Sequence, residues 1–414
     1  MIVVQRRIFL KALRDTMMCV PVASVTGAPA FGQTSRNRTV TNRQHLKLFL
    51  AGDVMTGRGI DQVLPHPGNP ALHESYVSDA RDYVRLAETK SGPIETPVAY
   101  PYIWGDALDI WAAHEPDLRI VNLETSITTS DDYWPSKGIH YRMHPYNVGC
   151  LTAAKLDCCV LANNHVLDWG YAGLGETLTT LRVAGIDTAG AGRDIEEAQA
   201  PARLSVPGKG DVLVFAVADA SSGVPESWSA GQDRGGVHLL DDLSLGTAGR
   251  LADYIAAERL PGDVVVASIH WGGNWGYRVP VEQRLFAHRL IDSGTVDIVH
   301  GHSSHHPKAL EFYKGKAILY GSGDFVNDYE GIGGRERFRP WYAPMYFLTF
   351  DLHSRQVERV EIELLRVRRL QLIRSTAEDR QWLGARLNEF GKEFAATFEI
   401  SNGSLVARTS IAGQ

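Results

Sequence analysis

The chain has 414 residues, of which 44% are hydrophobic and 22% charged, and its formal net charge at pH 7 is −6. These proportions exclude an intrinsically disordered chain, and no apolar run approaches the roughly 18–20 residues of a membrane span, which excludes a multi-span membrane protein. The acidic balance argues against a nucleic-acid partner, and none is expected.

The N-terminus carries the pattern of an export signal. Arg6 and Arg7 precede a short apolar stretch and Lys11, and a weakly hydrophobic segment follows. This arrangement resembles a twin-arginine signal, so residues 1–30 are interpreted as the signal and residues 31–45 as a linker. The resemblance implies export to the periplasm or to the outer face of the cell membrane; the alternative is a disordered start.

From residue 46 onward, short apolar runs alternate with loops or helices. Seven of these runs stop on polar side chains: Leu46–Ala51 before Asp53, Leu118–Val121 before Asn122 and Glu124, Cys158–Ala162 before Asn163, Asn164 and His165, Val212–Ala218 before Asp219, Val264–Ile269 before His270, Val296–Val299 before His300 and His302, and Ala317–Tyr320 before Ser322 and Asp324. Most are apolar at consecutive positions, which is typical of strands covered on both faces. With helices expected at Gly173–Ala184 and Glu282–Asp292, the pattern predicts a layered α/β domain over residues 46–374.

Two regions lie outside this alternation. Residues 61–106 are rich in proline and aromatic residues, contain one helix-like stretch near Val77–Ala87, and are interpreted as a long excursion that walls or covers a crevice. After Pro340, the sequence predicts two strands at Met345–Leu352 and Val357–Leu365, and residues 375–414 then form a helix and a hairpin. The helix is expected over Ala377–Ala396 behind Thr376, and the hairpin turns at Asn402-Gly403. This C-terminal part is interpreted as packing on the same domain and completing its sheet.

The polar strand ends predict a common site. In layered α/β sheets, ligands collect outside the carboxyl ends of the strands, where the loops converge. Carboxylates at Asp53 and Glu124, an amide at Asn164 and imidazoles at His165 and His270 form a mixed oxygen and nitrogen set. Such a set suits one or two divalent ions of Mn, Fe or Zn better than Ca or Mg.

Four histidines stand within residues 300–306. The local sequence His305-His306-Pro307 prevents all of them from pointing the same way. His302 and His305 are therefore predicted as ligands, whereas His300 and His306 are assigned supporting or structural positions.

Several of these motifs, in this order, resemble the CapA/PgsA poly-γ-glutamate capsule-synthesis family, which is related to the calcineurin-like metallophosphoesterases. The resemblance covers residues 47–328 and is carried by Ala51-Gly52-Asp53-Val54-Met55, Asn122-Leu123-Glu124, Leu161-Ala162-Asn163-Asn164-His165 with Asp168 and Gly170, Gly190-Ala191-Gly192, His270-Trp271-Gly272, Gly301-His302-Ser303-Ser304-His305 and Gly321-Ser322-Gly323-Asp324-Phe325. It implies an α-β-β-α sandwich of the metallophosphoesterase type, with the site at the carboxyl ends of the strands.

The resemblance also implies roles for individual residues. It suggests a two-metal site for hydrolysis, and it carries over position by position to six candidate metal ligands, Asp53, Glu124, Asn164, His270, His302 and His305, with His165 as the candidate acid or phosphate contact. Three departures stand out. Met55 replaces a histidine, Leu123-Glu124 replaces a second Gly-Asp, and two residues instead of one separate His302 from His305.

Three further residues are candidates for substrate binding. Lys137 and Arg142 form a local cationic group that suits a phosphate or a polymer carboxylate. The same sequence pattern also fits a solvated basic loop. Trp271 directly follows His270 and suits a polymer groove; aromatic packing over a loop is the alternative.

The sequence therefore predicts an exported CapA-like protein of anionic surface-polymer biosynthesis or export, acting as a metal-dependent hydrolase. An anionic polymer or a phosphoester is the expected substrate, and the family association implies membrane subunits of a polymer synthase as partners. A non-catalytic polymer-binding or assembly subunit is the rival hypothesis, favoured by Met55 and by the His302/His305 spacing. Hydrolysis of a different bond, such as an amide of a cell-wall peptide, is a third.

Overall fold

The computed structural model describes residues 44–394 and 396–409. The predicted export signal and the linker up to residue 43 lie outside the described residues. None of the described helices is long and apolar enough to cross a membrane.

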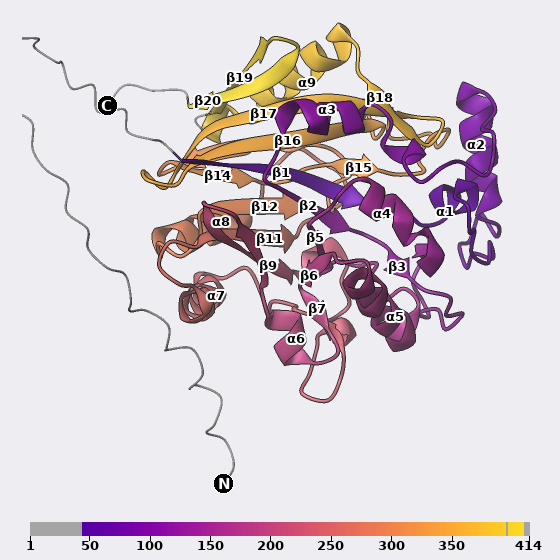
Figure 1. The fold of residues 1–414 in the computed structure, drawn as a ribbon, viewed down its shortest axis with the longest axis horizontal. Coiled ribbons are helices and arrows are strands. Elements are labelled where there is room, and N and C mark those ends of the chain that lie inside the picture. Colours follow the sequence, from indigo (N-terminus) through magenta and orange to yellow (C-terminus); the bar gives the residue numbers. More distant parts are fainter. Residues whose placement is uncertain (1–43, 395, 410–414) are drawn as a thin grey trace, which may run out of the picture. The chain divides into compact units, whose positions relative to one another are not determined.

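Two large sheets organise the described chain (Figure 1). The larger has the order β19 (Ala396–Ser401), β20 (Ser404–Thr409), β17 (Gln356–Arg368), β16 (Tyr342–Asp351), β1 (His45–Val54), β2 (Leu118–Leu123), β5 (Cys158–Val160) and β6 (Asp187–Ala189), with β15 (Asp324–Val326) beside β1 and β18 (Gln371–Arg374) beside β17. The six-stranded sheet has the order β13 (Leu310–Tyr313), β14 (Lys316–Leu319), β12 (Ile298–His302), β11 (Val264–His270), β9 (Gly210–Ala218) and β8 (Ala202–Val206). Two short pairs complete the strands: β7 (Ala191–Gly192) with β10 (Gly236–Val237), and β3 (Ser126–Ile127) with β4 (Arg142–Met143).

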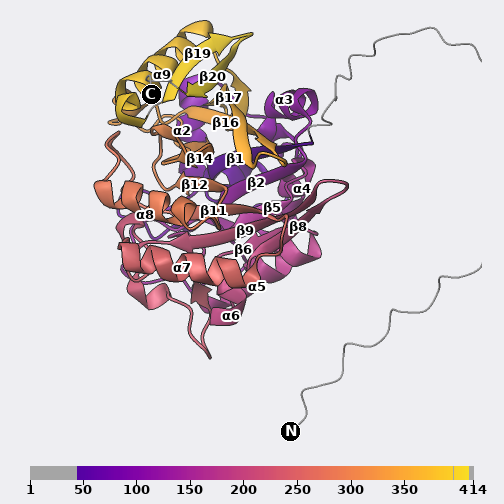
Figure 2. The same ribbon diagram turned by 90° about the vertical axis from the view of Figure 1, so that its left-hand side faces the viewer.

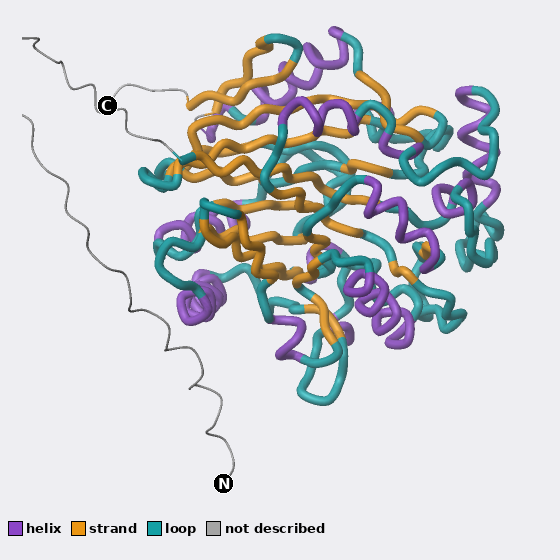
Figure 3. Tube along the Cα trace, in the orientation of Figure 1, coloured by secondary structure: helices purple, strands orange, loops and turns teal. Residues whose placement is uncertain are grey.

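Helices lie outside the two sheets (Figures 2 and 3). They are α1 (Gly59–Val63), α2 (Arg81–Ser91), α3 (Ala107–His114), α4 (Gly149–Ala153), α5 (Gly170–Val183), α6 (Ile195–Gln199), α7 (Leu245–Glu258), α8 (Val281–Asp292) and α9 (Ala377–Phe390). One face of the six-stranded sheet packs against α7 and α8, and its other face joins the core shared with the larger sheet. On the larger sheet, Phe49 of β1 packs edge-on against Trp111 of α3 at 5.1 Å between ring centroids. The predicted α/β sandwich with four layers is confirmed.

Burial on both faces of the sheet explains why these continuous apolar runs form strands. In β9, the side chains of Val212 and Val214 enter the core between the sheets, whereas those of Leu213 and Phe215 enter the core under the helices. A strand covered on both sides has no polar face, so its sequence is a continuous apolar run. All seven predicted runs form strands, with ends that differ by a few residues.

Two of the predicted helices differ from the structure by four or more residues at one or both ends. The helix of the excursion is α2, which begins later than the expected Val77, and Asp79 accepts a hydrogen bond from the Arg81 amide at 2.9 Å just before it. The C-terminal helix α9 begins as predicted, with a capping box between Thr376 and Asp379, but ends at Phe390. It stops there because the chain turns back to form β19.

The C-terminal hairpin extends the larger sheet. Its strands β19 and β20 pair with each other, and β20 also pairs with β17. Asn402 and Gly403 both have positive φ at the turn, 53° and 91°, as a two-residue hairpin turn of this twist requires.

Candidate metal centre

The strand ends of both sheets bring the polar residues together. Asp53 near the end of β1 pairs with Asn122 of β2 and, on its other side, with Asp324 of β15. In the six-stranded sheet, His270 and His302 are register partners at the ends of β11 and β12. Since all of these neighbours run parallel, their side chains emerge at one edge, as the sequence pattern predicts.

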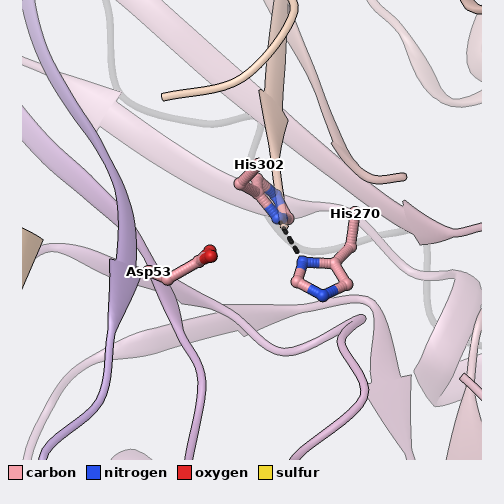
Figure 4. A group of neighbouring side chains, drawn as sticks. All are labelled: Asp53, His270 and His302. Carbon is pink, nitrogen blue, oxygen red and sulfur yellow. Dashed lines mark hydrogen bonds between the residues drawn. The ribbon is translucent and has the colours of Figure 1, made fainter. Parts of the chain in front are cut away.

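The first group of potential ligands is Asp53, His270 and His302 (Figure 4). One ligand atom from each lies within 4.8 Å of the other two, and all three residues are buried. The Nδ1 atoms of His270 and His302 are 2.8 Å apart. Burial keeps the pKa of both imidazoles well below the ordinary value, so they are neutral, which is the form that binds a metal.

The second group is Asp53, His305 and Asp324, which meets the same 4.8 Å limit. His305 Nδ1 lies 2.8 Å from Asp324 Oδ1, and the other Asp324 oxygen accepts a hydrogen bond from Asn327 at 2.9 Å. On its far side, His305 Nε2 lies 3.1 Å from the amide nitrogen of Asn274. Asp53 therefore belongs to both groups and stands between them.

The carboxylates of this centre are poorly satisfied by the protein. Asp53 Oδ2 and Glu124 Oε2 are buried, and the described residues provide no hydrogen-bond donor for either oxygen. Burial, together with the charge of Asp324, raises the pKa of Asp53 to about 7. Burial and the charge of Asp53 raise the pKa of Glu124 well above its ordinary value. A divalent cation would remove this repulsion and use the orphaned oxygens, so the donor set fits a metal.

Two predicted ligands lie beside these groups. Glu124 Oε1 is 3.8 Å from His270 Nε2, and Asn164 Oδ1 is 3.1 Å from the same nitrogen. Asn122 Nδ2 donates to Asp53 Oδ1 at 2.8 Å, which orients that carboxylate. The structure thus brings all six candidate ligands into one cluster, in which Asn164 is half-buried and the other five are buried.

His165 stands at the edge of the cluster. Its Nε2 lies 3.7 Å from Glu124 Oε1, and its Nδ1 lies 2.6 Å from Asp168 Oδ2. Lys137 Nζ is 2.7 Å from the other Asp168 oxygen and 3.0 Å from His165 Nδ1. Burial lowers the pKa of His165 to about 4, although Asp168 opposes the shift. Because a carboxylate can only accept, Nδ1 of the neutral ring carries the proton and Nε2 presents a lone pair toward the cluster.

Comparison with known proteins decides the family. The family model described as bacterial capsule synthesis protein PGA_cap matches residues 47–329. The chain belongs to this capsule synthesis family. The prediction of membership in the CapA/PgsA family is confirmed.

Two named relatives and one solved structure are similar to this chain. A probable polyglutamine synthesis accessory protein of Mycobacterium tuberculosis is 46% identical over 85% of this chain and 93% of its own length. The capsule biosynthesis protein CapA of Bacillus anthracis is 24% identical, over 69% of this chain and 60% of that protein. Among solved structures, a novel phosphatase of Mycoplasma pneumoniae covers 78% of this chain and 94% of its own at 14% identity, with a TM-score of 0.44.

Two of the three predicted substrate contacts, Arg142 and Trp271, have side chains that contact residues outside the cluster of ligands. Arg142 forms an ion pair with Asp131 at 2.8 Å and packs over the Trp169 ring at 3.7 Å. Trp271 is buried, packs against Phe286 and donates its indole N–H to the Tyr320 carbonyl. Among the three, Lys137 is the one whose polar head reaches a residue of the site.

One member of the centre is missing from the predicted ligand set. Asp324 had been recognised as a polar strand end but not as a ligand, and the structure places it opposite Asp53. The signal was present, because Gly323-Asp324 repeats the Gly52-Asp53 pattern of β1. A Cβ on Gly52 would lie 1.9 Å from the Gly323 carbonyl oxygen, so glycine is required for β1 to approach the residue that precedes β15.

Proposed function

We propose that this capsule synthesis protein is a metal-dependent hydrolase that acts on an anionic surface polymer such as poly-γ-glutamate. The observation that carries the proposal is Asp53, whose carboxylate is shared by two groups of buried metal ligands. The relatives' names connect the family with capsule and polyglutamine synthesis, which supports a surface polymer as the substrate class.

The protein's own groups divide the work of hydrolysis. One or two divalent ions, when bound, would supply Lewis acidity and lower the pKa of a water molecule. Asp53, with His270 and His302 on one side and His305 and Asp324 on the other, would hold these ions. His165, oriented by Asp168, presents Nε2 to accept a proton and return it to the leaving group.

Elemental analysis of the full chain, purified without added metal, tests this proposal first. Stoichiometric Mn, Fe or Zn that is lost in an Asp53→Ala/His302→Ala variant supports the centre. Hydrolysis is then measured on γ-glutamyl oligomers, phosphoesters and cell-wall peptides with the same two proteins. Absence of bound metal, even after reconstitution, overturns the proposal.

A non-catalytic polymer-binding or assembly subunit is the second candidate. The observation that favours it is Met55, a buried residue two positions after Asp53, at the place where metallophosphoesterases carry a histidine. This candidate requires metal-dependent thermal stability without turnover on any of the three substrate classes.

We also propose that the protein is exported and works beside membrane subunits of a polymer synthase. The paired Arg6-Arg7 and the family association support this placement. Cell fractionation of the wild type and of an Arg6→Lys/Arg7→Lys variant tests it. Retention of the variant in the cytoplasm is expected, and equal export of both proteins would contradict a twin-arginine route.

A further inference from the structure

Three pockets lie along the loop that follows β11, residues 271–280. The first, of about 250 Å³, opens at His305 and is also lined by Arg335. The second, of about 400 Å³, is lined by Arg278 and Lys308, and the third, of about 500 Å³, by Arg337 and Arg386. Trp275 lines the first and second pockets, and Gly276 and Arg278 line the second and third. The pockets are therefore neighbours along this loop, called here the tract, and the first of them is lined by His305 of the metal centre.

The tract is basic although the chain is acidic overall. Its cations, called here the basic tract, are Arg278, Lys308, Arg335, Arg337 and Arg386. Of these, Arg386 pairs with Glu389 at 2.6 Å, whereas the other four form no ion pair with any described residue. These five cations line the three pockets beside a single lining carboxylate, Glu282, so the excess of positive charge along the tract suits an anionic ligand.

Lys308 is the deepest cation of the basic tract. Its side chain is 6% exposed, and Gln283, 1% exposed, has no hydrogen-bond partner for either amide atom among the described residues. A Cβ on Gly272, which lines the second pocket, would lie 2.6 Å from Gln283 Nε2 and 3.7 Å from Lys308 Nζ. Lys308 lines the pocket, and the amide of Gln283 lies directly behind Gly272. The ammonium of Lys308 can donate the charge-assisted hydrogen bonds that a carboxylate accepts.

Aromatic rings form the apolar part of the tract. Tyr277 stacks on Phe390 of α9 with ring centroids 4.3 Å apart, and Phe338 lies 5.3 Å from Trp275 and 5.4 Å from Tyr277. These contacts fix the loop 271–280 against α9 and the segment 336–338. The cations therefore stand around a preformed surface that has apolar faces between them.

We propose that the basic tract binds a polycarboxylate chain and leads it to the His305 side of the metal centre. A γ-linked glutamate repeat carries one carboxylate and two backbone methylenes, which suit the cations and the ring faces of the tract respectively. This assignment rests on the proposed function for the identity of the polymer. Arg335, Arg337 and Arg386 lie beyond residue 329, where the family match ends, so the tract joins the family domain to its C-terminal extension.

Fluorescence anisotropy with a labelled γ-glutamate oligomer tests the basic tract on metal-free full-length protein. The triple variant Arg278→Gln/Arg335→Gln/Arg337→Gln changes three exposed residues and should raise Kd at least tenfold. The matched control Arg182→Gln/Arg250→Gln/Arg408→Gln removes the same charge at side chains that are 62–63% exposed elsewhere, and should change Kd less than twofold. Equal Kd changes in the two triple variants would overturn the proposal, as would an oligomer that does not bind.

Competition identifies the ligand class. Unlabelled polyphosphate and single-stranded DNA of matched charge are expected to displace the γ-glutamate oligomer poorly. Preference for either competitor would overturn the assignment to a polycarboxylate. Metal content, measured on the same proteins, separates this proposal from the proposed function: loss of binding in the tract variant stands whether or not the centre holds metal or hydrolyses a substrate.

Discussion

His165 has a role that can be separated from metal binding. It contacts the cluster through Nε2 and is oriented by Asp168, but it belongs to neither group of metal ligands. His165→Ala should therefore lower turnover by about 10²–10⁴-fold, the usual contribution of a general acid or base, while metal content stays unchanged. Steady-state hydrolysis and elemental analysis check both parts, with His353→Ala at an exposed turn as the control. A His165→Ala variant as active as the wild type would remove this residue from the mechanism.

The buried Lys308 should make the stability of the fold depend on pH. Burial lowers its pKa from the ordinary 10.5 to about 8, so the unfolded chain holds the proton more tightly than the folded one. Stability is reduced below about pH 8 and recovers as the pH rises to 10.5. Lys308→Met should raise the free energy of unfolding by roughly 3 kcal/mol at pH 7, and this gain should fade toward pH 10.5. Urea unfolding at several pH values measures it, and a gain that is independent of pH would contradict the buried charge.

At the scale of elements, Arg58 ties the excursion to the core. It donates to Asp328, next to β15, and to Glu74 in the excursion, and its guanidinium stacks on Tyr83 of α2 at 3.9 Å. Both carboxylates are buried, so Arg58→Met leaves two uncompensated charges and should cost about 3–5 kcal/mol of unfolding free energy.

Arg81→Met is the matched control for this variant, because Arg81 pairs with Asp79 in the same excursion but is 60% exposed. Its effect should stay within about 0.5 kcal/mol. Urea unfolding with unchanged m values measures both proteins. Similar losses from the two variants would show that Arg58 does not anchor the excursion.

Elements covered on both faces were the most predictable from the sequence. The run Val264–Ile269 has no polar face, and β11 occupies it with His270 at its end. Contacts between residues far apart in the sequence were harder to predict. The sequence predicts Arg142 as a ligand-binding cation, but in the structure its guanidinium pairs with Asp131 and packs over the ring of Trp169, which lies further along the chain. Likewise, nothing in the sequence of α9 shows that Phe390 packs on Tyr277, so its part in the basic tract emerged only from the fold.

At the scale of the molecule, each metal group joins the two sheets. Asp53 comes from β1 in the larger sheet, whereas His270 and His302 end strands of the smaller one; the second group joins Asp324 of β15 to His305, which follows β12. A bound cation therefore links the two halves of the sandwich. Since binding to the folded state alone stabilises it, metal at 100 times Kd should add about 2.7 kcal/mol of unfolding free energy. Thermal melting with and without chelator measures the gain under either proposed function.

The shared carboxylate of Asp53 predicts how metal stoichiometry depends on the substitution. His302→Ala removes a ligand from the first group alone, and Asp324→Asn removes one from the second, so each should lose up to one equivalent of metal and about half of the thermal stabilisation. Asp53→Asn weakens both groups and should lose all bound metal. Elemental analysis and melting of the three variants, reconstituted under the same conditions, check this order. If His302→Ala and Asp53→Asn lost the same amount of metal, Asp53 would serve one ion, and the centre would be mononuclear.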